Sequence, residues 1–171
     1  RDSPEVSRLK HMPDEDRRAA LEARDTPVRR DPTDLEGRSL NETELRQWID
    51  AGMLVGNHTW DHPCLDQCSP DEQLRQVTTA HEWLAEFCGA PPSRFAYPNG
   101  DWTAETERTL AHLDYDEAFL FDHRIDRTSG EHRLRRSRLR LDAASSPRRS
   151  DAVLSGFHSM SLTLRSRVRR T

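Results

Sequence analysis

Two histidines four residues apart are the side chains of this sequence with the clearest chemical potential. His58 and His62 lie in the stretch GNHTWDHP, residues 56–63, directly after a short apolar run. Imidazole nitrogens are common ligands of zinc and similar divalent ions. A loop that follows a strand and is fixed by a proline can hold two imidazoles together. The pair therefore predicts a divalent metal site at the end of a strand.

Two other interpretations of these histidines stay open. Cys64 and Cys68 follow in the pattern His-x3-His-x-Cys-x3-Cys, which supplies four ligands for a compact structural zinc site, although the usual two-residue spacing between cysteines is absent. The plainer alternative is a pair of solvated loop histidines. Nucleophilic catalysis by a cysteine is not supported, because nothing in the sequence assigns it a base partner.

A second stretch ends in a turn that could face the same site. Residues 94–97, Arg-Phe-Ala-Tyr, have the composition of a short strand, and Pro98-Asn99-Gly100 is a turn-forming tripeptide.

The elements that must position these two stretches alternate between helix and strand. Capping signals and apolar periodicity predict, in order, helix 41–51, strand 53–57, helix 69–88, strand 94–97, helix 103–112 and strand 118–121. His81 lies on the apolar stripe of the longest helix, where a structural histidine is expected. The alternation predicts an α/β fold, with a parallel sheet or a (β/α) barrel whose functional residues lie on the loops after the strands.

The two ends of the chain carry weaker signals. Residues 1–38 are interpreted as a polar, partly disordered segment in which only 13–21 has the acids and arginines of a short helix. After 122 we expect a strand within 134–141, a helix over 151–157 and a basic tail over 159–171. The predicted domain is 39–158.

Composition limits the classes of protein that this chain can be. Its residues are 33% hydrophobic and 33% charged, with a mean hydropathy of -0.94, so one modest core is expected. The net charge of -4 conceals a basic end, interpreted as solvated surface and not as a nucleic-acid site. Three cysteines exclude a complete disulfide framework, and no apolar run reaches the ~18 residues of a membrane span.

The two stretches together resemble two successive motifs of the polysaccharide deacetylase family, the NodB-homology carbohydrate esterases. GNHTWDHP is similar to the His-(Ser/Thr)-x-x-His-Pro motif, and RFAYPNGD, residues 94–101, is similar to the motif that follows it. They stand in the family's order, about one helix apart. The resemblance covers roughly residues 13–158, and 134–141 looks like the arginine-containing strand before the family's final helix.

This resemblance implies a fold, a reaction and a set of roles. The fold would be a distorted (β/α) barrel, incomplete at its amino terminus, and the reaction N- or O-deacetylation of a polysaccharide or oligosaccharide. Zinc or a similar ion would be held by His58 and His62, and Thr59 would shape their loop. Arg94 would orient an acidic partner, backbone N–H groups near Tyr97 and Asn99 would face the developing oxyanion, and Trp102 would line the sugar pocket.

One family motif has no counterpart. A strand ending in paired aspartates supplies the family's general base and a metal ligand, and Asp14 and Asp16 do not fit it because they lie in a polar, helix-forming stretch. We therefore expect a deacetylase domain that begins after this motif. The alternatives are a non-catalytic carbohydrate-binding remnant of the same fold and a small zinc-stabilised interaction domain.

Overall fold

A small parallel sheet lies at the centre of the molecule. The computed structural model describes residues 3–23, 39–125, 132–141 and 145–156. Strands β1 (Arg94–Ala96) and β2 (Glu117–Phe119) pair in parallel, with Phe95 opposite Ala118. Isolated parallel bridges extend the sheet on both sides, Asn57 beside Phe95 and Arg136 beside Phe119. Four segments thus lie in parallel in the order in which the chain visits them.

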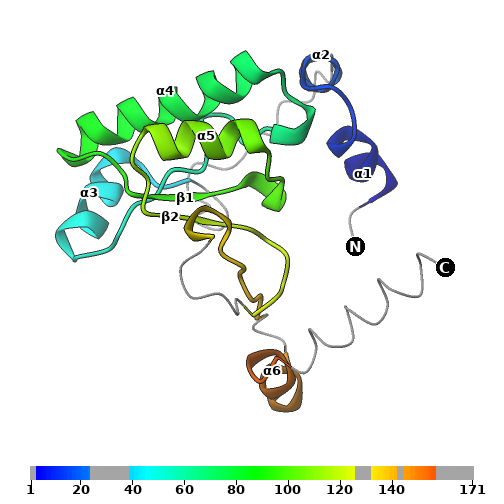
Figure 1. Cartoon of the computed structure of the whole chain (residues 1–171), viewed down its shortest axis with the longest axis vertical. Helices are drawn as coiled ribbons and strands as arrows, with labels where there is room; N and C mark the ends of the chain where they lie inside the picture. Colours follow the sequence, from blue (N-terminus) through cyan, green and yellow to red (C-terminus); the bar gives the residue numbers. More distant parts are fainter. Residues whose placement is uncertain (1–2, 24–38, 126–131, 142–144, 157–171) are drawn as a thin grey trace.

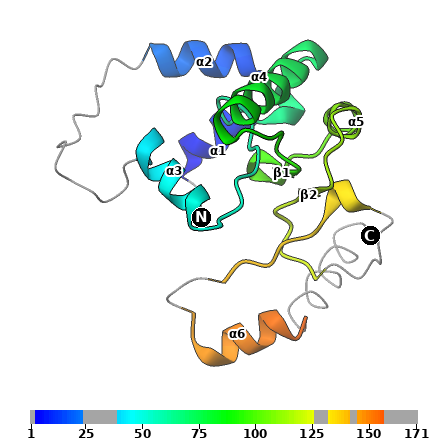
Figure 2. The ribbon, with the colours of Figure 1, turned by 90° about the vertical axis from the view of Figure 1, so that its left-hand side faces the viewer.

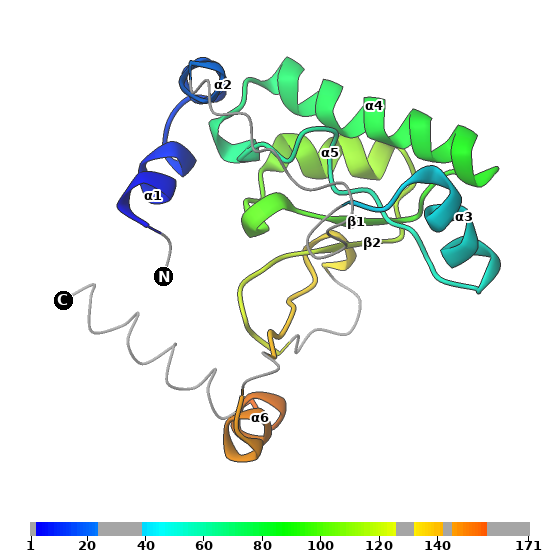
Figure 3. The ribbon, with the colours of Figure 1, turned by 180° about the vertical axis from the view of Figure 1, so that it is seen from behind.

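Two helices cover one face of this sheet. Helices α4 (Pro70–Cys88) and α5 (Ala104–His112) lie side by side on it, and α6 (Pro147–Leu154) lies on the other side (Figures 1 and 3). The core between helices and sheet is built from apolar and aromatic side chains: Leu65, Val77, Phe95, Tyr97, Leu110, Tyr115, Ala118 and Leu134. Burial of this cluster provides the main stabilising free energy of the fold.

Helix α4 follows from its capping residues. The Ser69 hydroxyl accepts a hydrogen bond from the Glu72 backbone N–H at 3.3 Å, and Pro70 occupies the first turn. Gly89 ends the helix in the left-handed conformation, with φ 73°. The predicted helix over 69–88 is confirmed, but its buried face is rotated from the expected one. Leu74 is 48% exposed, whereas Gln73 and Gln76 are buried.

The other predicted helices are also present. Helix α3 (Glu42–Asp50) begins with the predicted Asn41–Glu44 capping box, α5 begins at the Thr103 cap, and α2 (Asp14–Glu22) matches the prediction for 13–21. Helix α2 lies beside the amino-terminal end of α4 (Figure 2). Short 3-10 turns complete the described elements: η1 Leu65–Gln67, η2 Pro98–Gly100 and η3 Arg133–Arg135.

Helix α1 (Pro4–Lys10) contradicts the interpretation of its residues as loop or disorder. The Ser3 hydroxyl accepts from the Val6 N–H at 3.2 Å and Pro4 opens the helix. This is the same serine–proline start that identified α4. Its polar composition, with no buried residue, hid the helix from a periodicity argument.

Two predicted strands are reduced to single bridges. In 53–57 only Asn57 pairs, and Met53 and Leu54 are 52% and 79% exposed. Among the described residues, no segment pairs with the outer side of this run, so it does not form a strand. In 134–141 only Arg136 pairs. The last helix is present as α6 but begins at Pro147, after a Ser146 cap, and not at 151.

The α/β class with parallel strands is confirmed, whereas a closed barrel is not formed by the described residues. The predicted tail 159–171 and residues 24–38 lie outside the described ranges. Within the residues that the structure describes, no helix has the length and hydrophobicity of a membrane-spanning segment.

Candidate functional site

The histidine loop, residues 57–63, leaves the sheet at the edge where the parallel strands end. The Asn57 N–H donates to the Arg94 carbonyl at 2.8 Å, and the Ala96 N–H donates to the Asn57 carbonyl at 2.9 Å. The next residue, His58, therefore lies beside the end of β1. Its Nδ1 is 2.6 Å from the carbonyl oxygen of Ala96. Loops at this edge carry the working residues of parallel α/β folds.

The contact with Ala96 determines what the His58 ring can do. A carbonyl accepts only from a protonated nitrogen, so Nδ1 carries the hydrogen and Nε2 keeps its lone pair. Loss of hydration lowers the pKa of His58, the hydrogen bond to Ala96 raises it, and the charges of His62 and Arg138 lower it again, with a net decrease. The ring of His62 lies 4.8 Å from that of His58, edge to face at 82°. Two imidazoles this close to each other can serve one metal ion.

The backbone of the histidine loop is strained. Thr59 and His62 have φ values of 70° and 55°, in the left-handed region that β-branched residues rarely adopt. Hydrogen bonds compensate: the Asn57 Oδ1 accepts from the Thr59 N–H at 2.8 Å, and the Thr59 hydroxyl oxygen accepts from the His62 N–H at 3.1 Å. The expected role of Thr59 in shaping the loop by hydrogen bonding is thereby confirmed. Such strain is typical of functional loops.

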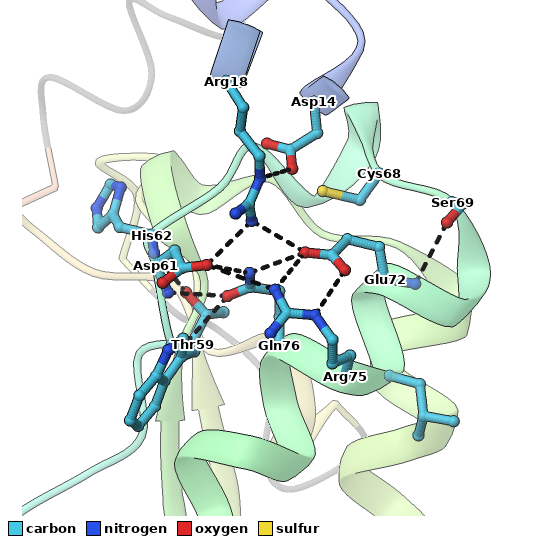
Figure 4. A network of polar contacts seen from close by, with 12 residues as sticks. Asp14, Arg18, Thr59, Asp61, His62, Cys68, Ser69, Glu72, Arg75 and Gln76 are labelled. Atoms are coloured by element: carbon cyan, nitrogen blue, oxygen red, sulfur yellow. Dashed lines mark hydrogen bonds and ion pairs between the residues drawn. The ribbon is translucent and has the colours of Figure 1, made fainter. Parts of the chain in front are cut away.

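A polar network joins the histidine loop to α4 and α2 (Figure 4). The side-chain amide of Gln76 bonds Trp60, Asp61 and Glu72, and Arg18 of α2 bonds the carboxylates of Asp61 and Glu72, each at 3.0 Å. Burial raises the pKa of Asp61, but hydrogen bonds from Gln76 and Arg18 outweigh it, so the net pKa is lowered. Asp61 is thus held as a carboxylate that faces α4.

Sequence reasoning missed this network because it treated α4 as an apolar stripe. The available signal in the sequence was a pair of glutamines, Gln73 and Gln76, three residues apart on the helix. Both side chains are at most 6% exposed. Buried amides need partners, and here the partner is the loop that carries the histidines.

The turn after β1 is fixed by its backbone. Tyr97 is fully buried; its N–H donates to the Phe119 carbonyl at 3.0 Å and its hydroxyl donates to the Leu134 carbonyl at 2.9 Å. Asn99 has φ 54°, and its side-chain amide lies 3.5 Å from the Cys64 sulfur. At Gly100 φ is 85°, and a Cβ there would lie 2.6 Å from the Phe121 nitrogen, so only glycine fits.

Trp102 follows this turn and is held by polar partners. Its indole N–H donates to Glu107 Oε2 at 2.5 Å, and the guanidinium of Arg135 lies 4.7 Å from the ring centroid. The ring is 37% exposed. These two partners, Glu107 and Arg135, lie outside the histidine loop, so the predicted place of Trp102 in a sugar pocket stays a prediction.

Arg94 lies at the opposite edge of the sheet from the histidines. It begins β1, whereas His58 contacts Ala96 at the end of that strand. The acidic partner of Arg94 is Glu117 on β2, at 3.3 Å. The Arg94 side chain is therefore paired with β2, while only its backbone carbonyl contacts the histidine loop, at Asn57, and its predicted role in orienting a catalytic acid stays a prediction.

A different arginine, Arg138, has a minor electrostatic effect on His58. Its positive charge lowers the pKa of His58. Its Nε donates to the Leu120 carbonyl at 2.6 Å and its guanidinium lies 5.6 Å from the Phe121 ring centroid. Burial lowers the pKa of Arg138 itself. The sequence offered only a general signal, an arginine-containing segment in which several arginines alternate with apolar residues.

The alternative zinc site of His58, His62, Cys64 and Cys68 is not formed. Within residues 3–23, 39–125, 132–141 and 145–156, no three histidine, cysteine, aspartate or glutamate side chains converge to hold a metal ion. The Cys68 thiol donates to the Cys64 carbonyl at 3.4 Å. Burial, with Asp14 and Glu72 nearby, raises the pKa of Cys68 to about 12, so this thiol stays protonated at neutral pH.

Comparison with known proteins gives a consistent set of relatives. The family model described as polysaccharide deacetylase matches residues 30–118. A chitooligosaccharide deacetylase of Bradyrhizobium sp. (strain ANU 289) is 37% identical over 73 residues, which are 42% of this chain and 33% of the relative. One of Azorhizobium caulinodans is 36% identical over 55 residues, 32% of this chain and 26% of the relative. The chain thus matches a third or less of these relatives' length.

Solved structures share the fold. The Streptococcus pyogenes deacetylase PplD, in complex with acetate, superposes with a TM-score of 0.61 at 24% identity over 69% of this chain and 52% of that one. A polysaccharide deacetylase from Bacillus cereus superposes with a TM-score of 0.57 at 18% identity over 70% of this chain and 38% of that one.

The family model spans the histidine loop, β1 and the turn after it, and it covers more than half of the sequence. The resemblance of the two motifs to this family is therefore confirmed. This chain belongs to the polysaccharide deacetylase family.

Proposed function

We propose that this chain carries the histidine part of a metal-dependent hydrolase that removes acetyl groups from a polysaccharide or oligosaccharide. The bond cleaved would be a non-peptide carbon–nitrogen bond in an N-acetyl sugar, or an ester in an O-acetyl sugar. Two relatives are named as chitooligosaccharide deacetylases, so an acetylated chito-oligosaccharide is the substrate to test first. The observation that carries the proposal is the close packing of the His58 and His62 rings at the carboxyl edge of the sheet.

The donor chemistry of this pair fits a divalent ion such as zinc. The Ala96 carbonyl accepts the Nδ1–H of His58 and leaves Nε2 as a ligand. Metal-binding histidines usually donate their other ring N–H to a carbonyl or carboxylate in this way. His62 contributes the second imidazole. When bound, the ion supplies a Lewis acid that polarises an acetyl carbonyl and acidifies water. Further protein ligands would have to come from outside the described residues.

The turn after β1 is our candidate for stabilising the oxyanion. Two N–H groups were predicted for this role, but that of Tyr97 is engaged by the Phe119 carbonyl. We therefore assign the role to the backbone N–H of Asn99, which η2 presents in a left-handed conformation. A donor fixed before the reaction stabilises developing negative charge without reorganisation. Trp102, three residues on, would contact the sugar.

The sheet would be part of a distorted (β/α) barrel. Four parallel segments that neighbour one another in chain order, with helices packed on one face, are the succession from which such barrels are built. The exposed Met53 and Leu54 mark the side on which a further strand would pair.

Zinc binding by single-histidine variants tests the proposal directly. His58→Ala and His62→Ala are each expected to weaken zinc binding by more than about 100-fold, because removal of a ligand costs more than removal of a second-shell partner. His112→Ala, on the exposed end of α5, is the matched control. Equal zinc retention after dialysis in all three variants would refute the histidine site.

Acetate release from acetylated chito-oligosaccharide tests the reaction itself. The wild-type chain is expected to release acetate only with the metal present, and His58→Ala to abolish the release. Unchanged acetate release in His58→Ala would contradict the proposed role of His58 as a metal ligand.

One observation favours a second candidate function, glycan binding without cleavage. In the described part of the chain no carboxylate joins the histidine pair, since Asp61 faces Gln76 and Arg18. General-base catalysis typically contributes about 10²–10⁴-fold, so a site without a base would bind far better than it hydrolyses. Saturable binding of the oligosaccharide with no acetate release at any metal concentration would support this candidate.

A further inference from the structure

The side-chain amide of Gln76 is completely buried between α4 and the histidine loop (Figure 4). Its Oε1 accepts from the backbone N–H groups of Trp60 at 3.1 Å and Asp61 at 2.9 Å. Its Nε2 donates to Asp61 Oδ2 and to Glu72 Oε1, both at 3.0 Å. An amide has two acceptor sites and two hydrogens to donate, so every hydrogen-bonding position of Gln76 is used.

These bonds fall on the segment between the two histidines. Trp60 and Asp61 connect Thr59 to His62, the two residues of the loop with left-handed backbone. Such conformations are energetically unfavourable for residues other than glycine and persist only where surrounding contacts fix them. Gln76 supplies that constraint from a rigid helix, because it engages both of the residues that lie between the strained positions.

The charge on Asp61 is balanced within the same network. Its carboxylate receives Arg18 at 3.0 Å and Arg75 at 3.4 Å, in addition to the Gln76 amide. The side chain that separates the two histidines in sequence is therefore turned toward α4.

We propose that Gln76 is a positioning residue that holds Trp60 and Asp61 so that the imidazoles of His58 and His62 are set for one divalent ion before it binds. It touches neither imidazole and acts through the loop backbone. The inference rests on the proposed metal-dependent function. Second-shell partners of metal-binding residues typically contribute about 10–100-fold to metal affinity, and Gln76 is expected to fall in that range.

Gln73 provides a matched control on the same helix. It is 6% exposed, and its amide bonds the Cys68 carbonyl at 3.0 Å and the hydroxyls of Thr103 and Thr106 at 2.5 and 2.9 Å. These three partners of Gln73 lie outside the histidine loop. Gln76→Met and Gln73→Met each remove a buried amide of the same size, so general loss of stability is common to both variants. Only a positioning role distinguishes them.

The first readout uses the metal-free chain. Amide hydrogen exchange at Asp61 is expected to accelerate in Gln76→Met relative to the amides of α4, and to stay as in the wild type in Gln73→Met. The Trp60 N–H also donates to the backbone carbonyl of residue 76 at 3.1 Å, a bond that neither substitution removes. The second readout is zinc affinity by competition with a chromophoric chelator. We expect a loss of about 10–100-fold in Gln76→Met and of less than about threefold in Gln73→Met.

A swap of donor and acceptor provides the rescue. Gln76→Glu keeps the acceptor for the two backbone N–H groups but faces the carboxylates of Asp61 and Glu72 with a third carboxylate, so it should weaken zinc binding. Adding Asp61→Asn returns an N–H donor to one of these two contacts and should recover part of the lost affinity. This isosteric pair also decides the question if Gln76→Met fails to fold.

Unchanged exchange and affinity in Gln76→Met, or a double variant no better than Gln76→Glu alone, would overturn the inference. Failure of the wild-type chain to bind zinc would instead count against the proposed function. The exchange measurement, which needs no metal, would then still decide whether Gln76 holds the loop.

Discussion

The two edges of the small parallel sheet carry different kinds of polar chemistry. At the carboxyl edge, His58 and Asn57 are fixed by backbone carbonyls, and the loop between the histidines is held by the buried Gln76. At the amino edge, Arg94 and Glu117 form an ion pair whose side chains are 41% and 33% exposed. Exposed ion pairs contribute little, about 0–1 kcal/mol, whereas buried and fully satisfied polar groups specify one conformation.

The two edges of the sheet separate residues that are close together in the motif RFAYPNGD, residues 94–101. Arg94 and Asn99 are five positions apart, yet the strand between them carries them to opposite edges. Since the carboxyl edge carries both histidines on a loop with two left-handed residues, Thr59 and His62, we infer that function lies at that edge.

Two arginines give the largest expected contrast. Arg138→Met removes the cation that acts on His58 and should lower kcat/KM for deacetylation by about 100-fold, or about 2.7 kcal/mol, because a fixed charge at the reacting edge stabilises developing negative charge. Arg94→Met should change kcat/KM by less than about threefold. Initial-rate kinetics on one substrate compares them. An equal loss in Arg94→Met would restore the orienting role predicted from the sequence.

The Tyr97 hydroxyl tests whether the turn is held from beneath. Tyr97→Phe removes the hydrogen bond to the Leu134 carbonyl and leaves that oxygen buried without it, which should cost about 1–2 kcal/mol of unfolding free energy. Urea unfolding measures the cost. Zinc affinity should stay within about threefold of the wild type, because the hydroxyl lies in the core and not at the histidines. A large loss of zinc affinity at unchanged stability would contradict this division.

The smallest effect concerns pH. Hydrogen bonds from Arg75 lower the pKa of Glu72 to about 2, from an ordinary 4.5. A lowered folded-state pKa stabilises the fold above pH ~4.5, and this contribution is lost as the pH falls toward ~2. After allowance for partial exposure of the side chain, we expect about 1 kcal/mol.

Glu72→Gln should therefore be less stable than the wild type at pH 7, and the difference should disappear near pH 2. Thermal unfolding between pH 7 and pH 2.5 follows it. Glu82→Gln, at an exposed position of the same helix, is the control and should leave the slope of stability against pH unchanged. An equal change of slope in both variants would mean that the network around Asp61 is not the acid-sensitive part.

Local sequence was sufficient for much of the architecture. Caps such as Ser69 and Asn41 act within one helical turn, so helix starts could be predicted from neighbouring residues alone. The histidine loop and the turn at Asn99 were likewise found from short motifs, and the family that they resemble is the one to which the chain belongs. Helix α1 was missed although its Ser3–Pro4 start carried the same information.

The tertiary structure decided which of these residues meet. Whether 53–57 forms a strand depends on a neighbouring segment and not on its own apolar residues. The side-chain partners of Arg138 and Arg94, and those of Gln76 other than Glu72, lie between 15 and 23 positions away in the sequence. Spacing determined that the chain has two neighbouring imidazoles after a strand. Packing of the histidine loop against β1 decided which nitrogen of His58 is free. Packing of the same loop against α4 decided that Gln76 is the buried amide that bonds Asp61.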